Sequence, residues 1–138
     1  LVGSEMCIRD SHYTTAYDLY LIFNECLKDE RFVEIISLNP YTAVITGADG
    51  TTRTETWIPT HFYASGDAVA PNGVQVIGGK TGTTNKAGNC VILYDEDSDG
   101  TPYISVIMGA EDKTILYEEM NQLFSAGILQ GISASSSN

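Results

Sequence analysis

Three β-rich runs follow one another in the second half of the chain, separated by short polar connections. They span Val74–Lys80, Asn89–Asp95 and Tyr103–Met108. Connections this short can join antiparallel strands, whereas parallel strands need a crossover of a dozen or more residues. The sequence therefore predicts an antiparallel sheet, and this prediction limits the possible folds more than any other feature.

Helical patterns flank these strands. Thr15-Ala16-Tyr17-Asp18 has the form of a capping box, and an apolar face follows it at Leu19, Ile22, Phe23, Cys26 and Leu27. A second short helix is expected from Asp29, with Phe32, Ile35 and Ile36 buried. A closing helix is expected over Asp112–Phe124, with Leu116, Met120, Leu123 and Phe124 facing inward.

A hairpin is expected between the second helix and the first of the three strands. Tyr41–Thr46 and Arg53–Ile58 are β-rich and are separated by Gly47-Ala48-Asp49-Gly50. Residues 59–73 show no regular pattern. Helices laid on an antiparallel sheet give the fold class α+β.

Composition excludes several classes of function. A net charge of −11 disfavours binding to nucleic acid or to an anionic membrane surface. The three cysteines, Cys7, Cys26 and Cys90, show no metal-binding spacing, and the chain has two histidines. Asp95–Gly100 imitates the first half of a calcium-binding loop, but Val106 stands where the bidentate glutamate belongs, so we interpret this stretch as a solvated hairpin turn. We expect neither a metal nor a cofactor.

The first eleven residues differ in kind from the rest. LVGSEMCIRDS resembles the in-frame translation of a transposase-type sequencing-library adapter, with a match through every codon. We expect residues 1–11 to be an adapter-derived scar, so that the natural N-terminus is missing. Residues 12–128 then form the folded part, and the Ser-rich residues 129–138 form a flexible tail.

The stretch GGKTGTTNKAGN, residues 78–89, carries the clearest chemical signal. A phosphate-binding P-loop would need a glycine at position 74, which is Val74, and a helix after the lysine, where Gly and β-branched residues stand instead. Lys-Thr-Gly on a strand is one of three signatures of penicillin-binding proteins and class A β-lactamases. Taken alone, that tripeptide is a weak match, and a surface lysine near a strand end is the more common explanation.

Two further blocks extend the match. HYTTAYDL at residues 12–19 precedes the Lys-Thr-Gly block, and YISVIMGA at residues 103–110 follows it. From about His12 to about Phe124 the chain resembles the serine D-alanyl-D-alanine carboxypeptidases, the low-molecular-weight penicillin-binding proteins. The resemblance implies part of a β-lactamase/DD-peptidase-like fold, in which the Lys-Thr-Gly strand forms one wall of the active-site groove.

The resemblance also implies a reaction and a place of action. A serine would attack the penultimate carbonyl of a peptidoglycan stem peptide ending in D-Ala-D-Ala, and water would release the acyl-enzyme. The expected site residues are Lys80, Thr81 and Gly82 as the catalytic element, with the Thr83 N–H as an oxyanion donor. β-Lactams would bind the same site, and the parent protein would act outside the cytoplasmic membrane, anchored or secreted.

Two family elements, Ser-x-x-Lys and Ser-x-Asn, are missing from the chain, since Ser37-Leu38-Asn39 and Ser136-Ser137-Asn138 stand in the wrong order to be the second of them. No serine is followed by lysine three residues later, so the Ser-x-x-Lys nucleophile and base are absent. We therefore expect a C-terminal fragment that is itself inactive. Two alternatives stay open, a β-lactamase-like serine hydrolase and a non-catalytic peptidoglycan or penicillin binder, and the upstream sequence distinguishes them.

Overall fold

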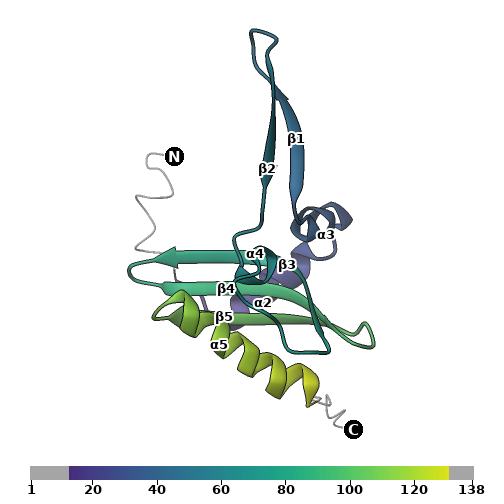
Figure 1. Cartoon of the computed structure of the whole chain (residues 1–138). Helices are drawn as coiled ribbons and strands as arrows, with labels where there is room; N and C mark the ends of the chain where they lie inside the picture. Colours follow the sequence, from purple (N-terminus) through teal and green to yellow (C-terminus); the bar gives the residue numbers. More distant parts are fainter. Residues whose placement is uncertain (1–12, 131–138) are drawn as a thin grey trace.

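The computed structural model describes residues 13–130, and the predicted scar, His12 and the tail from residue 131 lie outside the described residues (Figure 1). The elements in order are α2 (Ala16–Cys26), α3 (Glu30–Ser37), β1 (Tyr41–Thr46), β2 (Thr52–Trp57), α4 (Phe62–Ser65), β3 (Val74–Thr84), β4 (Gly88–Asp97), β5 (Pro102–Ala110), α5 (Lys113–Leu123) and a π-helix over Phe124–Leu129. The predicted α+β class is confirmed.

The predicted antiparallel sheet is present, with strand order β3-β4-β5. Each strand is longer than predicted, and β3 continues past Lys80 to Thr84. The extension pairs Thr81 with Val91 and Thr83 with Asn89. β-Branched threonines suit a pleated strand, which explains why the strand does not end at the lysine.

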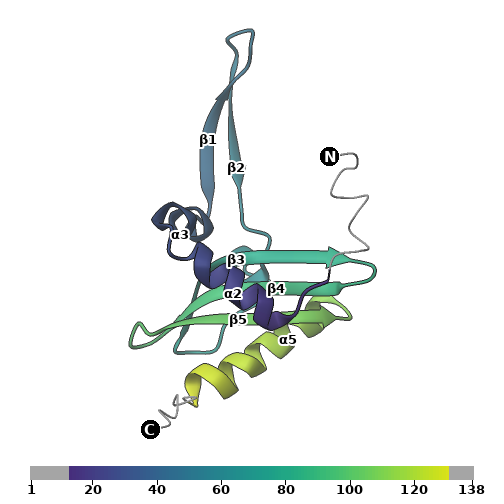
Figure 2. The ribbon, with the colours of Figure 1, turned by 180° about the vertical axis from the view of Figure 1, so that it is seen from behind.

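Helices cover both faces of this sheet. In Figure 1, α5 lies in front of the strands, and in Figure 2, seen from behind, α2 crosses them. The face under α5 and the π-helix holds the buried core, which consists of Val91, Leu93, Ala110, Leu116, Tyr117, Met120, Phe124 and Ile128. Of the four residues predicted to face inward on the closing helix, Leu116 and Met120 of α5 and Phe124 of the π-helix are buried there, whereas Leu123 is 37% exposed.

The predicted capping box at the start of α2 is confirmed. The Thr15 hydroxyl accepts a hydrogen bond from the Asp18 N–H at 3.0 Å, and the Asp18 carboxylate accepts one from the Thr15 N–H at 3.1 Å. Phe23 is buried on the inner face of the helix, but Ile22 is 60% exposed, so the apolar face is narrower than predicted.

Replacing Thr15 by alanine is expected to lower the free energy of unfolding by about 1 kcal/mol. The Asp18 N–H would lose the hydroxyl that accepts its hydrogen bond, and the capping box would no longer be complete. Urea unfolding of the chain measures this. Thr14→Ala is the matched control, since its hydroxyl makes only a 3.4 Å contact with the Thr15 carbonyl. Equal losses in the two variants would contradict the capping role.

The second helix packs closely on β3. A Cβ added at Gly78 would collide with the backbone carbonyl oxygen of Ile36, near the end of α3. This close approach requires glycine because no side chain fits between helix and strand. The predicted start at Asp29 is confirmed as the N-cap, whereas Ile35, predicted to be buried, is 66% exposed.

The predicted hairpin projects from the body as β1 and β2 (Figure 1). Its second strand is Thr52–Trp57, one residue earlier than predicted at each end. Tyr41 and Trp57 stack at its base with ring centroids 5.9 Å apart. Within residues 59–73, predicted to be irregular, the short helix α4 begins at the His61 cap.

Candidate active site

Lys80, Thr81, Gly82 and Thr83 lie in the C-terminal half of β3. In the sheet that the described residues form, β3 is an edge strand whose one neighbour is β4. Its outer edge therefore offers backbone N–H and C=O groups to which an extended peptide could pair. The structure brings the four predicted site residues together on this edge.

The register divides these residues between the two faces of the sheet. Lys80 lies opposite Ile92, and Gly82 opposite Cys90. Thr81 lies opposite Val91, which belongs to the core under α5. Since cross-strand partners share a face, Lys80 and Gly82 face the side of the sheet that carries α2 and α3, while Thr81 and Thr83 face the α5 side.

Lys80 and Gly82 leave the strand accessible on their side. Lys80 is exposed, and its ammonium group donates a hydrogen bond to the Thr81 carbonyl oxygen. A Cβ added at Gly82 would meet no atom within 4 Å. The site therefore combines a positive charge with an open strand backbone, which suits an anionic, extended ligand.

Thr81 has a partner that the sequence did not predict. Its hydroxyl lies 2.7 Å from the hydroxyl of Thr60, in the segment between β2 and α4. Thr60 carries no motif signal, because it lies in a segment without periodicity and 21 residues before Thr81. Only the folded chain brings the two hydroxyl groups together.

Thr83 is tied to the neighbouring strand. Its hydroxyl donates to the Asn89 side-chain oxygen at 3.1 Å, and the Asn89 amide donates to the backbone oxygens of Ala110 and Glu111 at 3.2 and 3.1 Å. A short turn joins β3 to β4, and Gly88, the first residue of β4, has a φ of 67°, a conformation that favours glycine. These bonds hold the end of the candidate site against β4 and β5.

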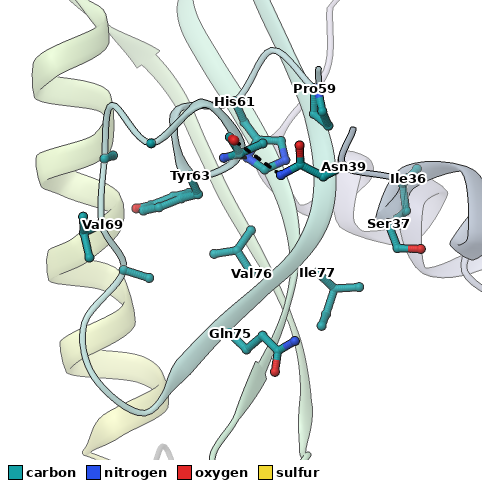
Figure 3. Close-up of a pocket in the computed structure, with 14 residues that line it drawn as sticks. Ile36, Ser37, Asn39, Pro59, His61, Tyr63, Val69, Gln75, Val76 and Ile77 are labelled. Carbon is teal, nitrogen blue, oxygen red and sulfur yellow. Dashed lines mark hydrogen bonds between the residues drawn. The ribbon is translucent and has the colours of Figure 1, made fainter. Parts of the chain in front are cut away.

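A cavity of about 560 Å³ lies near the start of β3 (Figure 3). Its lining includes Asn39, His61, Gln75 and Val76, but not the candidate site residues Lys80–Thr83. The His61 side chain is buried, its Nδ1 accepts a hydrogen bond from the Ala64 N–H at 3.3 Å, and burial lowers its pKa. The Asn39 amide donates to the Ala64 carbonyl at 3.3 Å, drawn as a dashed line in Figure 3.

The interpretation of Asp95 as part of a solvated hairpin turn is wrong. The sequence pattern places it at the start of a solvated turn, but β4 runs on to Asp97 and the Asp95 side chain is fully buried. Burial raises its pKa to about 7, against a smaller opposing effect of the nearby Ser105 hydroxyl. Ser105 does not reach hydrogen-bond geometry, and neither carboxyl oxygen has a partner among the described residues.

Cysteines and metal-ligating groups are dispersed. Cys26 and Cys90 are free thiols. Within residues 13–130, no three side chains of histidine, cysteine, aspartate or glutamate gather where they could hold a metal ion. None of the helices in the same range is long and apolar enough to cross a bilayer.

Two solved structures share this fold. One is a D-alanyl-D-alanine carboxypeptidase from Mycobacterium tuberculosis, with 22% sequence identity and a TM-score of 0.66. The other is an evolved putative penicillin-binding protein homologue from the same organism, with 23% identity and a TM-score of 0.66. Each match covers 91% of this chain and 44% of the solved one, so this chain spans less than half the length of these structures.

Sequence comparison is consistent with the structural likeness. A search of curated proteins finds no match. The sequence model described as D-alanyl-D-alanine carboxypeptidase matches residues 8–112, which is more than half of the chain and includes the whole Lys80–Thr83 element. The chain belongs to the D-alanyl-D-alanine carboxypeptidase family.

Proposed function

We propose that this chain is the C-terminal part of a serine carboxypeptidase that removes the terminal D-alanine from peptidoglycan stem peptides. The observation that carries the proposal is the placement of Lys80-Thr81-Gly82 on an open edge strand, inside the region matched by the family model. The longer protein to which the chain would belong is called the parent protein below.

Each residue of the edge strand has a role in this proposal. Lys80 supplies positive charge near the substrate carboxylate and the developing oxyanion. The Thr81 hydroxyl donates a hydrogen bond to the terminal carboxylate. Gly82 lets the substrate backbone approach, and the Thr83 N–H donates to the oxyanion.

The nucleophile would come from the part of the parent protein that precedes this chain. Its serine would attack the penultimate carbonyl carbon, the peptide C–N bond would break, and D-alanine would leave with a proton on its amine. Water would then cleave the ester and release the shortened peptide. β-Lactams would acylate the same serine, and the parent protein would act in the cell envelope, outside the cytoplasmic membrane.

The 138-residue chain by itself is expected to show no acylation, because it contains no Ser-x-x-Lys. The test is to sequence the gene upstream of the His12 codon, express the parent protein, and incubate both proteins with a fluorescent penicillin. Labelling of the parent protein alone supports the proposal. Labelling of the 138-residue chain, or a parent protein without Ser-x-x-Lys, contradicts it, and the second result favours a non-catalytic binder.

Replacing Lys80 by alanine in the parent protein is expected to lower the acylation rate constant about 100-fold, the usual cost of removing one group that stabilises the transition-state charge. Stopped-flow labelling with the same penicillin measures it. Lys28→Ala is the matched control, because Lys28 forms an exposed ion pair with Glu25 at the end of α2 and lies outside the candidate site. A loss below about threefold at Lys80 would remove it from the proposed site.

A further inference from the structure

The hydroxyl groups of Thr60 and Thr81 form a hydrogen bond across 2.7 Å, and either oxygen can be the donor. Thr81 belongs to the proposed carboxylate site, whereas Thr60 lies outside every motif in the sequence. The bond links the segment after the hairpin to the edge strand at the point where substrate would bind.

The backbone around Thr60 is held in place on its C-terminal side. His61 is only 5% exposed and caps α4 through its ring nitrogen. The N–H of Phe62 donates to the Tyr117 hydroxyl of α5 at 2.9 Å, and the two rings stack with centroids 4.6 Å apart. On the N-terminal side, Pro59 has a fixed φ. Thr60 is therefore presented to Thr81 by anchored backbone, although its own side chain is exposed.

The number of protons then decides the direction of the bond when substrate is present. The Thr81 hydroxyl has one proton to donate and two lone pairs that accept. A carboxylate only accepts, so the Thr81 proton must point to the carboxylate. The proton between the two threonines must then come from Thr60. A hydroxyl that accepts one hydrogen bond becomes a stronger donor in the next.

We propose that Thr60 is a positioning residue for Thr81: by donating to the Thr81 hydroxyl, it orients and strengthens that group as a donor to the terminal carboxylate of the substrate. The inference rests on the proposed function. It identifies the segment after the hairpin as a determinant of affinity for peptides that end in a free carboxylate.

The experiment compares Thr60→Val and Thr60→Ser in the parent protein, with a stem peptide ending in D-Ala-D-Ala as substrate. Valine matches the shape of threonine but cannot donate, so KM is expected to rise about 10-fold, with kcat nearly unchanged, because ground state and transition state lose the same bond. Serine keeps the hydroxyl and is expected to restore KM to within about twofold. Thr60→Ala serves as a second donor-free variant if the valine protein does not fold.

A double-mutant cycle tests whether Thr60 acts through Thr81. In a Thr81→Val background, Thr60→Val is expected to leave KM unchanged, since the hydroxyl that it would orient is gone. A purely structural role of Thr60 would instead lower stability and kcat in both backgrounds.

The outcomes separate the two claims. If the unsubstituted parent protein turns over the substrate but neither Thr60→Val nor Thr60→Ala changes KM, this inference is wrong and the proposed function still stands. Equal losses in the serine and valine variants, or additive losses in the double mutant, would also overturn the inference. No turnover by the unsubstituted parent protein would overturn the proposed function, and the inference with it.

Discussion

Replacing Gly78 by alanine is expected to lower the free energy of unfolding by about 3 kcal/mol, the upper part of the range for overpacked sites. The added methyl group would overlap the Ile36 carbonyl oxygen, and the Ile36 Cβ lies 3.3 Å away. Both obstacles belong to α3 rather than to the tip of a flexible side chain. Either α3 or β3 must therefore move.

Gly82→Ala is the matched control for this measurement. Gly82 lies in the same strand, and neither glycine has a positive φ, so alanine is tolerated by the backbone at both positions. The methyl group at position 82 would meet no atom within 4 Å. Both changes reduce the conformational entropy of the unfolded chain equally, which stabilises each variant by less than about 1 kcal/mol. The difference between their free energies of unfolding therefore isolates the contact with α3.

Urea unfolding of the two variants gives this difference. Trp57 is the single tryptophan, and together with Ile36, Gly79 and Lys80 it lines an open pocket of about 680 Å³ between α3 and the base of the hairpin. Its fluorescence emission therefore also reports a displacement of α3. A Gly78→Ala protein as stable as the Gly82→Ala protein, with unchanged emission, would mean that α3 does not pack against β3 as described.

Local patterns in the sequence were sufficient to predict most of the elements. The capping box located the start of α2, the β-rich runs located the three strands, and their short connections predicted antiparallel pairing. The placement of Lys80 on a strand also followed from local sequence, whereas Thr81 and Gly82 lie in the part of β3 beyond the predicted strand end. These features depend on neighbours within a few residues, which is the range that periodicity and turn chemistry can reach.

Features that depend on distant residues were missed. The contact between Thr60 and Thr81 and the collision at Gly78 both need the tertiary structure. The burial of Asp95 could have been predicted from the sequence, because every second residue of β4 faces inward and Asp95 follows Val91 and Leu93 in that alternation. Its charge suggested a turn, but the period of the strand determined its position.

Burial of Asp95 predicts a stability that depends on pH. Its pKa rises from 3.8 in the unfolded chain to about 7 in the folded one, mainly because burial disfavours the charged form. Well below pH 3.8 the carboxyl is neutral in both states, and its ionisation adds no penalty to folding. Between pH 4 and pH 7 the unfolded chain gives up the proton while the folded chain keeps it, so stability falls as pH rises.

The size of this effect follows from the shift. Each pKa unit corresponds to about 1.4 kcal/mol, so the wild-type chain is expected to lose about 4 kcal/mol through Asp95 between pH 4 and pH 8. The titratable group that interacts with it is Tyr63, whose own pKa is raised, mainly by burial and also by the Asp95 charge. Tyr63 therefore stays neutral throughout this range and does not offset the penalty.

Asp95→Asn removes the proton equilibrium while nearly preserving the shape of the side chain. The variant and the wild type are expected to be similarly stable at pH 4, and the variant is expected to be more stable by about 4 kcal/mol at pH 8, by urea unfolding at each pH. Asp99→Asn, in the exposed turn between β4 and β5, is the control for the loss of one surface carboxylate. All three proteins share their other carboxyl groups, so differences between them cancel the background titration. Parallel pH profiles for wild type and Asp95→Asn would mean that the carboxyl group reaches water or a hydrogen-bond donor.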